Sequence, residues 1–348
     1  MNPLILFTLL FGLIVGTTIT LTSSHWLYAW MGLEMNTLAI IPLMTQSHHP
    51  RAVEATTKYF LTQATAAAMI LFASLTNAWL SGQWDIGQMM HPLPTTLLTL
   101  ALAMKMGLAP LHAWLPEVLQ GLDLTTGLIL STWQKIAPFA LLMQISHPTP
   151  TLLIALGLTS TLLGGWGGLN QTQLRKILAY SSIAHLGWIM LVMQYSPQLA
   201  LLTLLTYFIM TSSAFLTFKI NKTMNINTLA TSWAKAPALT ALTPLVLLSL
   251  GGLPPLTGFM PKWLIIQELS KQELAPLATI AALSALLTLY FYLRLSYAMT
   301  LTVSPNTLTS LAPWRLSSNQ ATLPLAITLT ATLTLLPLTP AAMAVLTI

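Results

Sequence analysis

Cysteine is absent from this 348-residue chain, and charged side chains make up only 6% of it. The lack of thiols excludes disulfides, thiolate-bound iron–sulfur clusters and cysteine-type zinc sites within the chain. Soluble domains contain about 25% charged residues, so the low charge content excludes an ordinary soluble domain. Hydrophobic residues account for 55% of the chain instead. This composition indicates an integral membrane protein.

Apolar stretches long enough to cross a bilayer recur from end to end. A hydrocarbon core about 30 Å thick needs about 20 helical residues to span it. Eleven such windows are predicted, at residues 3–22, 25–45, 57–79, 95–120, 123–145, 149–169, 174–194, 198–219, 237–270, 274–299 and 323–346. The linkers between most of them are too short for a soluble domain. The sequence therefore predicts an all-α polytopic membrane protein that forms one domain over residues 1–348, with its first helix retained rather than cleaved as a signal peptide.

Basic residues between these windows or at their ends are concentrated at every second linker. The linkers that follow the second, sixth, eighth and tenth windows contain Arg51, Lys58, Arg175, Lys176, Lys219, Lys222, Lys235 and Arg315. Lys271 is the exception, and it stands beside Glu268 and Glu273. The positive-inside rule then places the N-terminus on the cytoplasm-equivalent side and the C-terminus on the opposite side. The net charge of +6 reflects topology rather than nucleic-acid binding.

Four ionisable residues lie deep inside predicted spans. At 1.5 Å per residue, Glu34 lies about 14 Å from His25, Lys105 about 15 Å from Thr95, Lys135 about 18 Å from Asp123 and Lys262 about 12 Å from Ser270. An unpaired charge at that depth costs about 2.5–3.5 kcal/mol, so each must face a partner or water. Glu34 and Lys105 are the obvious ion pair, with an attraction of roughly 2.8 kcal/mol at about 6 Å. The alternative reading of these residues is structural, as membrane anchors or counter-ions for folding.

Two of the spans contain clusters of proline and glycine that predict breaks near mid-membrane. Gly107 to His112, followed by Pro116, interrupts the fourth span, and Gly251 to Pro261 interrupts the ninth. Unwound backbone at membrane depth must be buried in protein or line a wet cavity. Two interrupted helices, each with a lysine at its break, indicate an ion pathway built from structural repeats.

Histidines offer weaker candidates for proton transfer. His112 in the first break either relays protons or hydrogen-bonds carbonyls freed by the break, and His185 is open to the same two readings. His48 and His49 are adjacent in a linker and point in different directions, so neither a haem pair nor a metal site is predicted. The chain is expected to hold no cofactor and no metal of its own.

Three motifs resemble the proton-pumping, antiporter-like membrane subunits of respiratory complex I from vertebrate mitochondria. They are the stretch from Lys105 to Pro116, the run from Ala179 to Gly187, and the segment from Gly251 to Pro261. The resemblance covers essentially the whole chain. It implies a core membrane-arm subunit that translocates protons across the inner mitochondrial membrane, driven by NADH:ubiquinone electron transfer in partner subunits.

The resemblance also implies residue roles and partners. The family's proton path matches Glu34 with Lys105, then Lys135, then Lys262. The implied partners are the antiporter-like and small core subunits of the membrane arm, supernumerary subunits, and lipids such as cardiolipin. The implied topology has the N-terminus in the matrix and the C-terminus in the intermembrane space. A cation/proton antiporter subunit and a purely structural spacer remain as alternatives.

Overall fold

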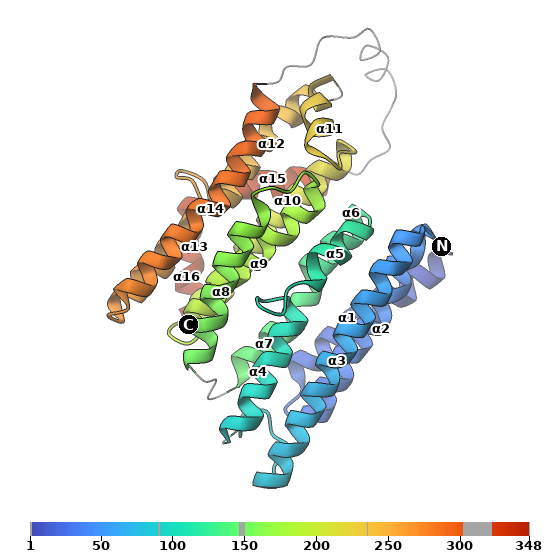
Figure 1. Ribbon diagram of the computed structural model, residues 1–348, viewed down its shortest axis with the longest axis vertical. Helices are drawn as coiled ribbons and strands as arrows, with labels where there is room; N and C mark the ends of the chain where they lie inside the picture. The colour runs from blue at the N-terminus through green and yellow to red at the C-terminus, as the bar shows by residue number, and fades with distance from the viewer. Residues whose placement is uncertain (1, 90, 146–149, 235, 302–321, 348) are drawn as a thin grey trace. The chain divides into compact units, whose positions relative to one another are not determined.

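The computed structural model describes residues 2–89, 91–145, 150–234, 236–301 and 322–347 (Figure 1). Regular structure in these ranges is helical, with two isolated bridges, His25 to Asp85 and Gln173 to Asn225. The chain divides into two compact units, Met1–Ser160 and Thr161–Ile348, and helix α8 (Pro150–Gly168) contains the boundary. The expectation of a single membrane domain stays a prediction.

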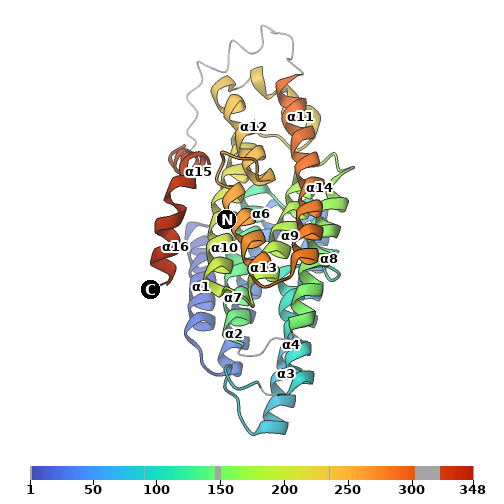
Figure 2. The ribbon, with the colours of Figure 1, turned by 90° about the vertical axis from the view of Figure 1, so that its left-hand side faces the viewer.

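The first unit is built from long helices and two interrupted ones. Its elements are α1 (Pro3–Thr22), α2 (Trp26–Met44), η1 (Thr45–Ser47), α3 (Pro50–Ser81), α4 (Pro92–Met106), α5 (Trp114–Gly121), α6 (Leu124–Ser131), η2 (Trp133–Lys135) and α7 (Ile136–Gln144). Helix α2 packs between α1 and α3, and α3 contacts both α4 and α5 (Figures 1 and 2). The contact of α3 with α5 borders the candidate site, because Tyr59 and Trp114 line its cavity.

The second unit is arranged around α10. Its elements are α9 (Leu174–Val192), α10 (Pro197–Ile220), α11 (Ile226–Ala230), η3 (Thr231–Ala234), α12 (Pro237–Gly251), α13 (Phe259–Lys271), α14 (Ala275–Thr300), α15 (Leu323–Thr334), η6 (Leu336–Leu338) and α16 (Thr339–Thr347). Helix α10 contacts α9, α12, α13 and α15, while α14 packs on α12 and α13. The apolar part of α15 and the helix after it form a pair bent by 70°, drawn in red in Figure 2.

Local sequence explains where the helices start. Proline occupies the first position of α1, α3, α4, α10 and α12, where its missing N–H would have no intrahelical partner. Inside the helices, threonine and serine hydroxyls donate to carbonyls three or four residues earlier, as Thr17 Oγ1 does to the Ile14 carbonyl at 2.8 Å. These bonds leave few hydroxyls exposed to an apolar surrounding, which suits a membrane interior.

Both predicted breaks are present, with one correction. Residues 107–113 separate α4 from α5, so the stretch from Gly107 to His112 lies outside regular helix as expected. The second break covers only residues 252–258, because Gly251 still belongs to α12 and α13 begins at Phe259. The expectation that the break reaches Pro261 is wrong. Pro261 is the third residue of α13, where a missing N–H leaves no helical bond unmade.

A third interruption was not predicted from the sequence. The span expected at 123–145 is split, since α6 ends at Ser131 and the 3-10 turn η2 precedes α7. Pro138 supplies the reason: it has no N–H for the carbonyl of Gln134 and its ring crowds that residue. The interruption places Lys135 at the junction of two half-helices.

The helices are long and apolar enough for a membrane, but their number as separate spans is smaller than the windows suggest. Within the described ranges, six helices are long and apolar enough to span a membrane, and the bent pair at the C-terminal end raises this number to seven. The interrupted helices fall short because each half is brief, and α9 is less apolar because Arg175 and Lys176 stand in its first turn. Exposed side chains such as Leu4 and Phe7 on α1 show the apolar outer surface that lipid requires. The exact count of eleven crossings stays a proposal.

Candidate functional site

Lys105 occupies the last turn of α4, directly before the first break. Gly107 adopts a left-handed conformation, and the Leu108 N–H donates to the Ala103 carbonyl at 3.0 Å, which closes the helix end. The Lys105 side chain is buried with 7% exposure. Its Nζ makes no hydrogen bond to the residues that the structure describes. The negative end of the α4 dipole is the favourable place for this ammonium.

Lys135 is positioned by the interruption between α6 and α7. Its side chain is 2% exposed. The neighbouring Gln134 donates from Nε2 to the Asn36 carbonyl at 3.2 Å, which ties η2 to α2. The break thus holds a buried lysine on a short turn that is anchored from a second helix.

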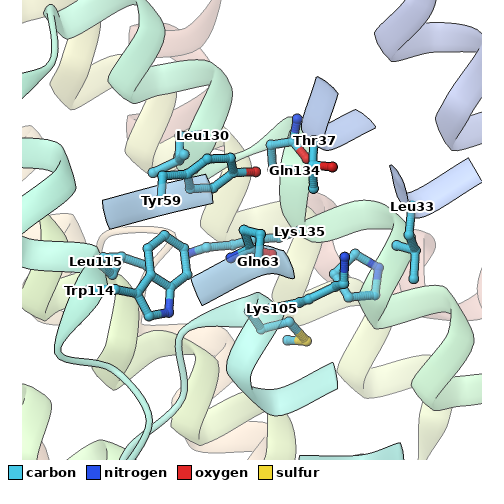
Figure 3. A pocket seen from close by; sticks show the side chains of 12 residues that line it. Leu33, Thr37, Tyr59, Gln63, Lys105, Trp114, Leu115, Leu130, Gln134 and Lys135 are labelled. Carbon is cyan, nitrogen blue, oxygen red and sulfur yellow. The ribbon is translucent and has the colours of Figure 1, made fainter. Parts of the chain in front are cut away.

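Lys105 and Lys135 line one cavity in the first unit (Figure 3). The space that a water molecule could occupy in it is about 10 Å³, enough for about one water. Its other lining residues are Leu33, Thr37, Tyr59, Gln63, Met106, Trp114, Leu115, Leu130, Gln134 and Pro138. Figure 3 shows the side chains of Lys105, Lys135 and Gln63 drawn together between the rings of Tyr59 and Trp114 and the α2 residues. Amide and hydroxyl groups therefore accompany two lysines inside an otherwise apolar bundle.

Glu34 lies beside this cavity without forming an ion pair. Its neighbours Leu33 and Thr37 line the cavity, and Thr37 Oγ1 donates to Glu34 Oε2 at 3.0 Å. Glu34 attracts Lys105 electrostatically. The ion pairs of 4.0 Å or less among the described ranges nevertheless involve only Lys58 and Lys271 with their acidic partners, so Glu34 and Lys105 stand apart in this structure.

Lys262 lies in the second unit, in the first turn of α13. Its Nζ donates to the Gly251 carbonyl at 2.7 Å, and the side chain is 9% exposed. Gly251 is the last residue of α12, so the ammonium sits on a free carbonyl at a helix C-terminus. Ser181, Ala184, His185, Trp188 and Thr288 line a smaller cavity together with Lys262.

The two candidate histidines occupy different surroundings. His185 shares the cavity of Lys262, and its ring packs on Tyr207 with centroids 5.5 Å apart. His112 lies in the first break, where its Nδ1 is 3.3 Å from the Pro110 carbonyl. It is not among the residues lining the cavity of Lys105 and Lys135. His185 therefore lies beside the buried Lys262, whereas His112 lies against the backbone of the first break.

Several polar residues around the site were not found from the sequence. Thr37, Tyr59, Gln63 and Gln134 line the first cavity, although no motif marks them. A detectable signal existed for two of them: Tyr59 and Gln63 are four residues apart and share one face of a helix. Within the described ranges, no group of three His, Asp or Glu side chains has the geometry to hold a metal ion.

Half-helices with buried lysines at their breaks define an antiporter-like membrane subunit. Residues 23–288 match the family described as NADH:quinone oxidoreductase/Mrp antiporter, and residues 289–343 match the C-terminal part of NADH dehydrogenase subunit 2. The chain belongs to this family. Among its relatives are the proteins named NADH-ubiquinone oxidoreductase chain 2 from Tetraodon nigroviridis, 74% identical over 98% of both chains, and from Salmo salar, 71% identical over 100% of both.

Solved structures agree with this assignment. A chain of respiratory complex I from Thermus thermophilus, solved with bound aureothin, has a TM-score of 0.88 and 28% identity, covering 99% of this chain and 81% of that one. A chain of the Mrp complex from Dietzia has a TM-score of 0.85 at 18% identity, covering 97% and 74%. The second likeness shows the fold alone, whereas the relatives place the chain among subunits of NADH-ubiquinone oxidoreductase. It is a membrane protein of mitochondrial complex I.

Proposed function

We propose that this subunit translocates protons across the inner mitochondrial membrane through Lys105, Lys135 and Lys262, driven by NADH:ubiquinone electron transfer in partner subunits. The observation that carries the proposal is the placement of all three lysines. Each is at most 9% exposed, and each stands at an interruption of a helix. Buried intramembrane cations are costly and typically mark an ion or proton path.

The first unit supports a short transfer between Lys105 and Lys135. Both line one cavity, together with the hydroxyls and amides of Thr37, Tyr59, Gln63 and Gln134. A neutral lysine amine accepts a proton and an ammonium donates one, so two such groups in a shared polar cavity form a relay. Transfer onward from Lys135 to Lys262 is part of the proposal and is supported by the burial of both side chains.

Glu34 has the proposed role of a switch for Lys105. It attracts Lys105 but makes no ion pair with it here, and Thr37 holds one of its carboxylate oxygens. Closing the pair stabilises charged Lys105, and opening it favours release of the proton to Lys135. His185 beside Lys262 fits a relay there, while His112 fits a hydrogen-bonding role in the break.

The proposed topology has eleven crossings, with the N-terminus in the matrix and the C-terminus in the intermembrane space. The interrupted helices count as single crossings because each pair of half-helices coincides with one apolar window. The basic residues of alternate linkers support the orientation. Lys235 and Arg315, which contribute to this asymmetry, lie outside the described residues.

The proposed partners are the antiporter-like and small core subunits of the membrane arm, supernumerary subunits, and lipids such as cardiolipin. The proposal includes no cofactor, metal or nucleic acid for this chain, since redox chemistry belongs to other subunits. The exposed apolar faces of α1 and α14, with Phe11 and Leu283 more than half exposed, fit lipid or neighbouring helices.

The decisive experiment replaces Lys135 by Met in the assembled complex. Methionine keeps length and apolar character but cannot take up a proton, so assembly and NADH oxidation are expected to persist while the number of protons translocated per electron falls. The measurement is the proton-to-electron ratio of the complex in sealed vesicles. An unchanged ratio with normal assembly would reject the relay.

A further inference from the structure

We propose that the ion pair between Lys58 and Glu117 is a gate through which protons enter the cavity of Lys105 and Lys135 from the surface. The proposal rests on the proposed function and adds residues to it that neither motif nor family match assigns. It concerns a row of contacts between α3 and α5, called here the α3–α5 seam and consisting of Arg51, Ala55, Lys58 and Tyr59 on α3 and Trp114, Glu117 and Gly121 on α5.

The outer part of the seam is charged and exposed. Lys58 Nζ lies 2.7 Å from Glu54 Oε1 on its own helix and 2.8 Å from Glu117 Oε2 on α5. The side chains of Lys58 and Glu117 are 42% and 54% exposed. The Lys58–Glu117 pair is therefore open to its surroundings on one side.

Next to the ion pair the two helices approach very closely. A Cβ atom on Gly121 would lie 2.6 Å from both the Ala55 Cβ and the Arg51 carbonyl oxygen. The end of α5 is therefore seated directly on the start of α3, and Glu117 lies one turn earlier on α5. The ion pair and this close contact together hold α5 against α3.

The inner part of the seam is the wall of the cavity. Tyr59, which follows Lys58, and Trp114, one turn before Glu117, meet with ring centroids 5.8 Å apart in an edge-to-face arrangement. Both residues line the cavity of Lys105 and Lys135, as Figure 3 shows. The ion pair at the surface and the two rings at the cavity are thus consecutive contacts of the same two helices.

Trp114 also links the seam to Lys105. Its Nε1 donates to the Met104 carbonyl at 3.1 Å, and Met104 immediately precedes Lys105. A displacement of α5 from α3 moves Trp114, opens the wall and disturbs the end of α4 together. This arrangement couples the state of Glu117 to the lysine that the proposed relay uses.

The proton balance of the gate is simple. A proton from the aqueous side binds the Glu117 carboxylate, which becomes neutral and loses its attraction to the Lys58 ammonium. The seam loosens, and the proton passes through the cavity to a neutral lysine amine, which becomes an ammonium. Glu117 is again a carboxylate and re-forms the pair with Lys58. No electrons move, and Lys58 keeps its charge throughout.

The chain supplies a matched control for testing the gate. Glu117→Gln removes the pair that joins two helices, whereas Glu54→Gln removes the pair within α3 from the same lysine. Because the chain contains no cysteine, Gln63→Cys introduces a single thiol of this subunit into the cavity wall. Modification of that thiol by a small water-soluble maleimide in the assembled complex, followed by mass spectrometry of the subunit, reports how open the cavity is.

Glu117→Gln is expected to accelerate modification of the Gln63→Cys thiol by about two- to fivefold, the range that one exposed ion pair can supply. The exchange Lys58→Glu with Glu117→Lys restores opposite charges across the seam and returns the rate to that of the parent. Glu54→Gln leaves the rate unchanged. Equal rates for Glu117→Gln and Glu54→Gln, or no recovery in the exchanged variant, would overturn the gate.

A second readout separates failure of the gate from failure of the proton path. Without the cysteine, Glu117→Gln is expected to lower the proton-to-electron ratio, because glutamine takes up no proton, and Glu54→Gln to leave it unchanged. Lys135→Met is measured in the same preparation. A lower ratio for Lys135→Met with no effect of Glu117→Gln overturns the gate and leaves the path intact. No effect of Lys135→Met overturns the path, and the thiol rates still decide whether the seam opens.

Discussion

Helices α4 and α12 both end in a left-handed glycine, Gly107 with φ 80° and Gly252 with φ 84°. In each, the next residue closes the helix with a backbone bond five residues back, Leu108 to Ala103 at 3.0 Å and Leu253 to Leu248 at 3.2 Å. The lysines are placed differently: Lys105 precedes its break, and Lys262 follows its break and bonds back to the Gly251 carbonyl. The same helix ending therefore serves two electrostatic arrangements.

The difference teaches how each lysine is held. Lys262 has a fixed acceptor at 2.7 Å, so the backbone itself holds its ammonium. Lys105 has no hydrogen-bond acceptor among the described residues and depends on longer-range attraction from Glu34. A lysine held by backbone is suited to storing a proton, and a lysine held by a distant carboxylate is suited to being switched.

The largest expected effect comes from replacing either lysine by methionine. Lys105→Met and Lys262→Met should both abolish proton translocation through this subunit, but they should differ in stability. Lys262→Met strips the buried Gly251 carbonyl of its donor, which costs about 1–3 kcal/mol. Lys105→Met removes a buried ammonium without a hydrogen bond, which is neutral or stabilising. The proton-to-electron ratio and the thermal stability of the membrane arm check this, and equal destabilisation would contradict the comparison.

A smaller effect is expected from alanine at the two glycines. Left-handed backbone costs an alanine about 1–2 kcal/mol at either position. In Gly252→Ala the new Cβ also lies 2.9 Å from Lys262 Nζ and Cδ, whereas in Gly107→Ala it meets Leu115 Cδ1 at 2.7 Å. Both variants should lose similar stability, and Gly252→Ala should lower proton translocation more. Adding Gly252→Ala to Lys262→Met should then change the proton-to-electron ratio no further.

Glu34→Gln tests the other half of the comparison. It keeps the size of the side chain and removes the attraction to Lys105, so coupling between electron flow and translocation should weaken while Lys262 is unaffected. The expected change is a partial fall in the proton-to-electron ratio, smaller than for Lys105→Met. A ratio equal to that of the parent in a fully assembled complex would make Glu34 a structural counter-ion only.

The sequence predicted the parts of the fold that follow from composition and from proline. Apolar windows anticipated the helices, and the Gly/Pro clusters anticipated the breaks near Lys105 and Lys262. Pro261 misled, because the clash it produces is avoided when a helix starts just before it. Pro138 does interrupt its helix, and this signal was overlooked, although it explains the turn that bears Lys135.

Only the site residues that carry a charge inside an apolar span could be predicted from the sequence. An apolar span makes Glu34 and the three lysines conspicuous, since charge at that depth is costly. The places of Thr37, Gln63 and the α3–α5 seam in the site depend on how the helices pack against one another, which the sequence does not show. Threonine and glutamine are also common enough in spans to give no signal alone. The Lys58–Glu117 pair joins residues 59 positions apart, so no local pattern reveals it.

The smallest effect should come from Thr37→Val, which keeps the shape of the side chain and removes its hydroxyl. Thr37 Oγ1 lies 3.0 Å from Glu34 Oε2 and 2.8 Å from the Glu34 carbonyl, and its single hydrogen serves only one of them at a time. The net value of such a bond is about 1 kcal/mol. Its loss therefore changes the equilibrium between Glu34 held by Thr37 and Glu34 turned toward Lys105 by about fivefold at most. Glu34 then turns more readily to Lys105, whose ammonium is stabilised, and turnover should fall slightly. Thr37→Ser keeps the hydroxyl and should behave as the parent. If Thr37 acts through Glu34, Thr37→Val should have no effect in the Glu34→Gln background, and an additive loss there would show that the hydroxyl serves the cavity directly.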